Sequence, residues 1–202
     1  AAYGRDPDRV RRLVQVGTES LVVISLAVLG GSIALADPLV ANLLGEGFDR
    51  SAGLLPVLML AFVFISFGYL AGYLVPIVGL QWRFAAYAAV GVVANVGLNL
   101  LLIPSFGAYG SAWATVVTEL AVNGLALVGV MRALSFRPAL GRVLRAVLAA
   151  ALMTAAVALA AHAGLVVGLL VGPPVYLAAL LGLRVIVPAE LRELWRERAR
   201  PA

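Results

Sequence analysis

Two stripes of polar side chains interrupt long apolar segments in the middle of the chain. The first stripe is Tyr87, Gly91, Asn95 and Asn99, and the second is Ser111, Thr115, Glu119 and Asn123, with Thr118 beside it. A spacing of four residues places each set on one face of a helix. Amides and hydroxyls form hydrogen bonds with sugar hydroxyls, and a carboxyl group also holds a proton or a small cation. The stripes therefore predict a polar path for a substrate, with Glu119 as its one ionisable group.

Other chemistry is excluded by residue type. The chain has no cysteine, so disulfides, thiolate metal sites and cysteine nucleophiles are impossible, and the single His162 cannot build a multi-histidine metal site. An integral-membrane glycosyltransferase or polymerase would need acids or histidines beside a sizeable loop, where this chain offers only Glu46, Asp49 and His162. We expect a protein that is not an enzyme and that has no metal and no cofactor.

The elements that position the stripes are predicted to be membrane spans. Of the 202 residues 63% are hydrophobic and 12% charged, against about 45–50% and about 25% in soluble domains. Mean hydropathy is +1.03, and the apolar runs have about 20 residues, the length of a spanning helix. We predict an all-α integral membrane six-helix bundle with spans at 18–44, 53–80, 84–103, 109–131, 143–161 and 165–187. Segment 1–17 is expected to be cytoplasmic, and 188–202 to be a cytoplasmic amphipathic tail.

Prolines and glycines inside these spans predict bends and close contacts. We expect a kink at Pro38 or Pro76 and a bend near the centre of the last span, at Gly172-Pro173-Pro174. The pairs Gly68/Gly72 and Gly168/Gly172 allow neighbouring helices to approach closely.

The arginines set the orientation. One side of the membrane would carry all of them except Arg50, and positive loops stay in the cytoplasm. Both termini are therefore expected inside, as an even number of spans requires. This placement also argues against nucleic-acid binding as the reason for the net charge of +5. Because the chain starts at Ala1 and shows no signal peptide, we expect it to be part of a longer polypeptide.

Asn95 and Glu119 are predicted to lie at matching depth near mid-membrane, counted at about 1.5 Å per residue from a turn at Pro104-Ser105-Phe106-Gly107. Asn99 and Thr115 pair likewise. One interpretation is a shared hydrogen-bonding surface, in which the acid has a functional role. The alternatives are polar bonds that only hold helices together, and a protonated Glu119 bonded to Asn95.

The segment NVGLNLLLIPSFGAYGSAWATVVTE, from Asn95 to Glu119, resembles the signature of polysaccharide flippases of the multidrug/oligosaccharidyl-lipid/polysaccharide exporter superfamily. In that signature an N-x-x-L-N helix ends in L-I-P, turns through G-x-x-G and re-enters with small residues, A-T and an acid. The positions that match are Asn95, Leu98, Asn99, Leu102, Ile103, Pro104, Gly107, Gly110, Ala112, Ala114, Thr115 and Glu119. Trp113 departs from the pattern, where the family has a small residue. Weaker resemblance covers ALADPLVANLLGEGF and PPVYLAALLGL.

The resemblance implies one lobe of a two-lobed flippase with 12 or 14 spans, whose N-terminal lobe precedes this chain. Its substrate would be a lipid-linked oligosaccharide or polysaccharide precursor, flipped by alternating access across the cytoplasmic membrane of a prokaryote, in contact with membrane lipid. Asn95, Asn99, Thr115, Glu119 and Asn123 would line the substrate path. Glu119 would be the coupling-ion site.

The same resemblance implies that cationic side chains bind the pyrophosphate of the substrate. These would come from the other lobe, or would be Arg83 or Arg142 at the inner mouth. The alternatives are a flippase for the lipid-linked peptidoglycan precursor, a cation-coupled multidrug exporter of the same fold and, from another class, a structural or assembly subunit.

Overall fold

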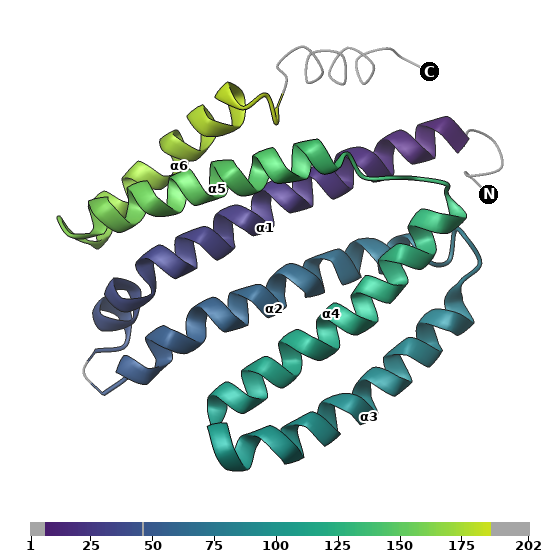
Figure 1. Cartoon of the computed structure of the whole chain (residues 1–202), viewed down its shortest axis with the longest axis horizontal. Coiled ribbons are helices and arrows are strands. Elements are labelled where there is room, and N and C mark those ends of the chain that lie inside the picture. Colours follow the sequence, from purple (N-terminus) through teal and green to yellow (C-terminus); the bar gives the residue numbers. More distant parts are fainter. Residues whose placement is uncertain (1–6, 46, 187–202) are drawn as a thin grey trace.

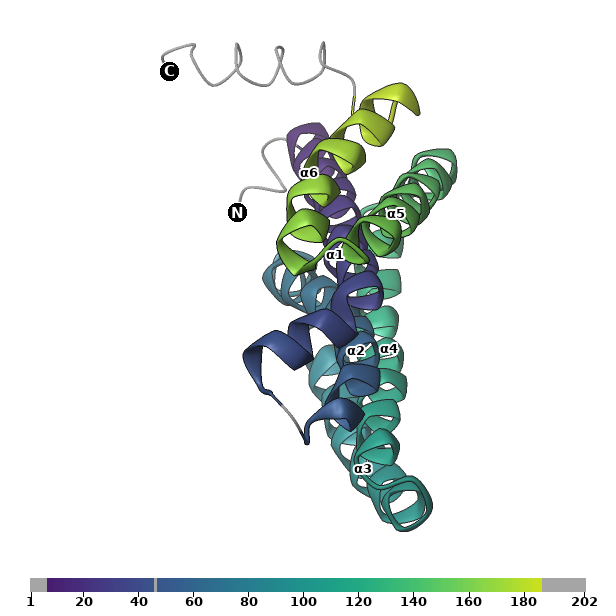
Figure 2. The ribbon, with the colours of Figure 1, turned by 90° about the vertical axis from the view of Figure 1, so that its left-hand side faces the viewer.

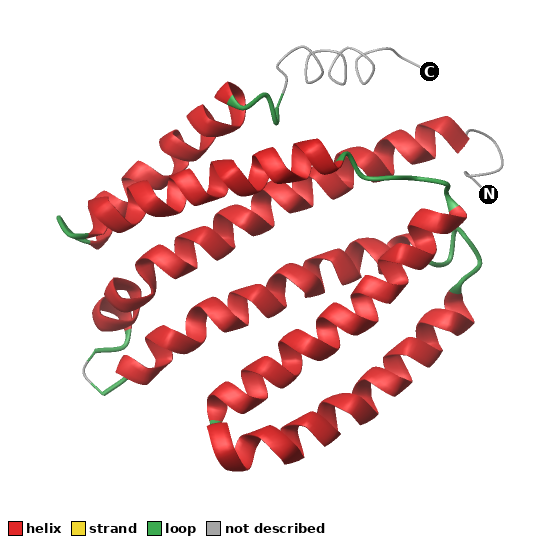
Figure 3. Cartoon of the chain, viewed as in Figure 1, coloured by secondary structure: helices red, strands yellow, loops and turns green. Residues whose placement is uncertain are grey.

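The computed structural model describes residues 7–45 and 47–186, and this part of the chain is helical, without a strand (Figure 3). The helices are α1 (Pro7–Leu43), α2 (Asp49–Leu74), α3 (Gln81–Phe106), α4 (Ala108–Ala133), α5 (Leu140–Ala161) and α6 (Leu165–Gly182). Each of the six is long and apolar enough to cross a membrane. The predicted all-α membrane fold with six spans is confirmed.

The helices lie side by side in a row, in the order α3, α4, α2, α1, α5, α6 (Figure 1). At one end of the row α3 packs on α4 alone, and at the other α6 packs on both α5 and α1. The view from the side shows the row edge on (Figure 2). Successive helices run in opposite directions, so α1, α3 and α5 start at the end of the molecule where α2, α4 and α6 finish. We call this the arginine-rich end, because it carries Arg83 at the start of α3, Arg132 at the end of α4 and Arg142 at the start of α5.

Helix boundaries differ from the prediction mainly at prolines. The described part of α1 starts at Pro7, inside the segment expected to precede the first span. The last turns of α1, which contain Pro38, turn away from the axis of the rest (Figures 1 and 2). Helix α2 ends at Leu74, before the predicted 80, so Pro76 follows the helix instead of kinking it.

The turn between α3 and α4 is also shorter than predicted. Helix α3 runs through Pro104 to Phe106, and Gly107 alone separates it from α4. Gly107 has φ 56° and ψ −132°, a conformation that is open to glycine and strained for other residues. Helix α6 continues through Pro173 and Pro174 and ends at Gly182. The predicted tail, 188–202, lies outside the described residues.

Small residues hold α1, α5 and α6 together. Gly30 lies so close to α5 that a Cβ atom there would collide with Thr154, and Gly168 faces Leu35 of α1. Close backbone approach of this kind is how membrane helices gain packing energy, because lipid leaves little hydrophobic driving force between them. A Cβ atom on Gly172 would also lie only 3.2 Å from Val157 of α5, so both glycines of the predicted α6 pair are at helix contacts.

Candidate functional site

The seam between α3 and α4 is held by one polar bond and by very close backbones. The Asn95 amide Nδ2 donates to the Thr118 hydroxyl across 3.0 Å. Near the turn, a Cβ atom on Gly110 would lie 2.5 Å from the Leu102 carbonyl oxygen of α3. Asn95 therefore meets Thr118, the residue next to Glu119, at the depth predicted. The alternative bond between Asn95 and Glu119 is absent from the hydrogen bonds of the described residues.

Asn123 marks the face of α4 that packs on α2. Its side chain is 8% exposed and lies against Gly68, where a Cβ atom would collide with the Asn123 amide. The Asn123 Nδ2 also donates to Glu119 Oε2 at 2.6 Å, one turn back on the same helix. Of the predicted glycine pair in α2, Gly68 is thus at a close contact, whereas Gly72 has open space around it.

Thr115 and Glu119 lie between these two contact faces of α4. Successive residues are rotated by about 100° around the axis of α4. Measured from Thr118 in one sense, Thr115 lies at about 60°, Glu119 at about 100° and Asn123 at about 140°. Both Thr115 and Glu119 are half-buried. The opposite side of α4 is apolar and exposed, as Val117 and Leu120 show. Thr115 and Glu119 of the predicted stripe therefore lie on one side of the row, between the α3 and α2 contacts of α4, whereas Asn123 is buried at the α2 contact.

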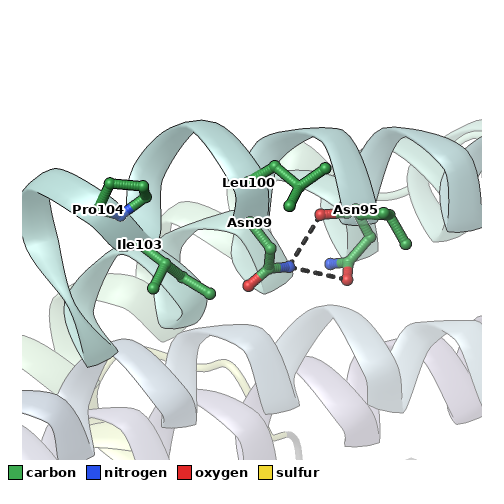
Figure 4. Close-up of a pocket in the computed structure, with 6 residues that line it drawn as sticks. Asn95, Asn99, Leu100, Ile103 and Pro104 are labelled. Carbon is green, nitrogen blue, oxygen red and sulfur yellow. Dashed lines mark hydrogen bonds between the residues drawn. The ribbon is translucent and has the colours of Figure 1, made fainter.

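An open groove of about 360 Å³ runs along α3 on that same side. Its lining residues are Asn95, Val96, Asn99, Leu100, Ile103 and Pro104. The Asn99 Nδ2 donates to the Asn95 carbonyl oxygen at 2.8 Å and to the Asn95 Oδ1 at 3.0 Å (Figure 4). The oxygen of the Asn99 side chain points away from Asn95, on the side of Ile103 (Figure 4).

The groove and the stripe share one face because of helix geometry. Helices α3 and α4 are right-handed and antiparallel. On each helix we measure rotation in the sense in which the chain winds, starting from the side that faces the other helix. Residues at similar positive angles on the two helices then lie on the same side of the pair. Val96 and Ile103 follow Asn95 in this sense on α3, as Glu119 follows Thr118 on α4. Asn95 and Asn99 thus lie on the same side of the helix pair as Thr115 and Glu119, and the exposed lining of the groove beside them is mostly apolar. We call these four polar residues the common polar face. Direct pairing of Asn99 with Thr115 is not seen, since Thr115 instead donates to the Ser111 carbonyl at 3.1 Å.

The two arginines considered for phosphate lie in different surroundings. Arg142 is half-buried and its Nη1 contacts Glu19 Oε2 at 2.8 Å, while Gln15 donates to the other Glu19 oxygen at 3.0 Å. Its charge is therefore balanced within the chain. Arg83 is exposed at the start of α3 and bonds to no residue of the described part.

Two positions of this seam, Thr118 and Gly110, are not predicted from the sequence as contacts between α3 and α4. Thr118 is predicted only to lie beside the polar stripe, and Gly110 is only a position of the resemblance. A signal for it was present, because small residues recur every four positions at Gly110, Ala114 and Thr118 and such a row predicts a helix contact. No protein-family model, curated protein or solved structure matches the chain.

Proposed function

We propose that this chain is a transporter lobe that moves a lipid-linked oligosaccharide or polysaccharide precursor across the membrane by alternating access. The observation that carries the proposal is the common polar face, where Asn95, Asn99, Thr115 and Glu119 stay half-buried inside the apolar helices α3 and α4. An acid at the centre of a lipid-facing helix costs about 2.5–3.5 kcal/mol on insertion scales. This face is therefore better suited to a water-filled path or to a second lobe than to lipid.

The groups on this face suit a ligand rich in hydroxyls. Amide and hydroxyl side chains supply both donors and acceptors, and the face carries no arginine at mid-span. The Glu119 carboxylate, within 2.6 Å of one amide, is the place for a coupling proton or small cation. The resemblance of Asn95–Glu119 to the flippase signature supports the same proposal.

The test is Glu119→Gln in the full-length transporter, which removes the charge and keeps the shape and an acceptor for Asn123. Asp37→Asn is the matched control, since Asp37 is an exposed acid of α1 away from the common face. We expect Glu119→Gln to depress export and Asp37→Asn to leave it near wild type, at equal amounts of protein in the membrane. Export unaffected by Glu119→Gln would remove the coupling role.

A structural role is the second candidate, because Thr118 and Asn123 are buried at helix contacts. In that case the polar groups would only hold α4 to its neighbours. Asn99→Ala separates the two, since Asn99 bonds only within α3. Loss of export at unchanged thermal stability favours transport, whereas loss of stability alone favours the structural role. Purified full-length protein that responds to organic cations and not to lipid-linked sugars would indicate a drug exporter of the same fold.

A further inference from the structure

The described arginines are concentrated at one end of the molecule, where the described side chains include little acid. Those whose side chains are described at this arginine-rich end are Arg11, Arg12, Arg83, Arg132, Arg137, Arg142, Arg145 and Arg184. Among described side chains the one acid there is Glu19, and Arg142 already contacts it. The opposite end carries Arg50. Positive charge at this end therefore exceeds what the described fold neutralises.

Two of these arginines form hydrogen bonds with backbone carbonyl groups of the chain. Arg11 donates to the Leu134 carbonyl at the end of α4 across 2.9 Å. Arg145 donates to the Leu183 and Arg184 carbonyls that follow α6, at 3.3 and 3.4 Å. Carbonyls at a helix C-terminus lack partners in the helix and attract cations, so these contacts cap α4 and α6.

Three others are exposed and bond to no residue of the described part: Arg83, Arg132 and Arg137. They belong to one region, because the residues next to them pack on one apolar cluster of Val14, Leu74, Val75, Val130 and Leu134. Leu80, Phe84 and Phe136 all pack against this cluster, and a Cβ atom added to Gly129 would lie 3.4 Å from the Leu80 side chain. The ends of α2 and α4, the start of α3 and the first residues after α4 are thus fixed together. We call the three the α3/α4 arginine surface.

We propose that the α3/α4 arginine surface binds the headgroups of anionic phospholipids. Guanidinium groups match phosphate oxygens in charge and geometry, and basic residues at the end of spanning helices attract an anionic leaflet. Trp82 beside Arg83 is 90% exposed, as befits a side chain at the level of the headgroups. This proposal does not depend on the transport role of the common polar face.

The chain contains its own reporters for a test. Trp82 lies at the arginine-rich end, and Trp113, 46% exposed, lies near the start of α4 toward the opposite end. Two single-tryptophan variants of the full chain are needed, one with Trp113→Phe and Trp195→Phe and one with Trp82→Phe and Trp195→Phe. Each is reconstituted with brominated phosphatidylglycerol or brominated phosphatidylcholine. Quenching by the two lipids gives their relative affinity beside each tryptophan.

We expect phosphatidylglycerol to be preferred at Trp82 and not at Trp113. Arg83→Gln should lower the preference at Trp82 about five-fold, and Arg132→Gln and Arg137→Gln should act similarly. Arg50→Gln is the matched control, because it removes one exposed arginine from the first turn of a helix at the other end. Arg83→Lys should keep most of the preference, and 1 M salt should abolish it, since screening then acts within about 3 Å.

Three results would overturn the proposal. One is an equal preference at Trp82 and Trp113, and another is an equal loss from Arg83→Gln and Arg50→Gln. The third is displacement of brominated phosphatidylglycerol from Trp82 by inorganic pyrophosphate when sulfate of the same ionic strength is inert. That result would assign the surface to a polyphosphate ligand. Failure here leaves the Glu119 test untouched, because the two use different residues and different readouts.

Discussion

Replacement of Gly110 by alanine tests the packing that places the two polar sets on one face. The added Cβ would lie 2.5 Å from the Leu102 carbonyl oxygen and 3.0 Å from the Ile103 nitrogen. Both are backbone atoms of a helix, so relief requires α3 and α4 to move apart. Overpacking of this kind costs about 1–3 kcal/mol, and alanine returns about 1 kcal/mol of helix propensity. Because the obstacle is backbone, we expect a net loss of about 2 kcal/mol in the free energy of unfolding.

Gly124→Ala is the matched control in the same helix. Its Cβ would meet Leu120 of α4 itself at 4.0 Å, an ordinary contact, so we expect a neutral effect or a gain of up to about 1 kcal/mol. Thermal or denaturant unfolding in detergent, followed by circular dichroism, measures both variants. A double-mutant cycle of Asn95→Ala and Thr118→Ala adds a local readout, since their coupling should fall in the Gly110→Ala background. Equal stability of Gly110→Ala and Gly124→Ala would refute the reasoning.

Three further substitutions test other parts of the fold by the same unfolding measurement. Ser135, at φ 51°, follows the C-cap of α4 in the left-handed region, so Ser135→Gly should stabilise by about 0.5–1 kcal/mol; a loss would contradict this. Tyr176→Phe removes the 2.8 Å bond to the Val23 carbonyl and should cost about 0.6 kcal/mol; no change would mean that the bond contributes nothing. Gly30→Ala should destabilise more than Gly31→Ala, whose Cβ enters open space, and the reverse order would be inconsistent with the α1–α5 contact.

The existence of the six helices follows from the sequence because apolar runs of spanning length have no other stable state in lipid. The ends of the helices are predicted less accurately. A proline in the sequence predicts a kink or the end of a helix, yet Pro104, Pro173 and Pro174 lie inside helices. Helix α4 continues to Ala133 and ends without glycine, because Phe136 and Ser135 donate to carbonyls of its last turn while Ser135 takes the positive φ. That closure depends on Leu134 and Phe136 belonging to one apolar cluster, which is tertiary information.

The candidate site shows the same division between depth and direction. The depth of a residue along its helix follows from the number of residues between it and the turn. This count correctly predicts that Asn95 lies at the depth of the middle of the second stripe. Direction depends on which face of α4 meets α3, and one residue changes it by about 100°. Gly110 sets that choice, because α4 can approach the α3 backbone closely only where a side chain is missing. Thr118 consequently fills the seam, and Glu119, turned out of it, is left on the common polar face.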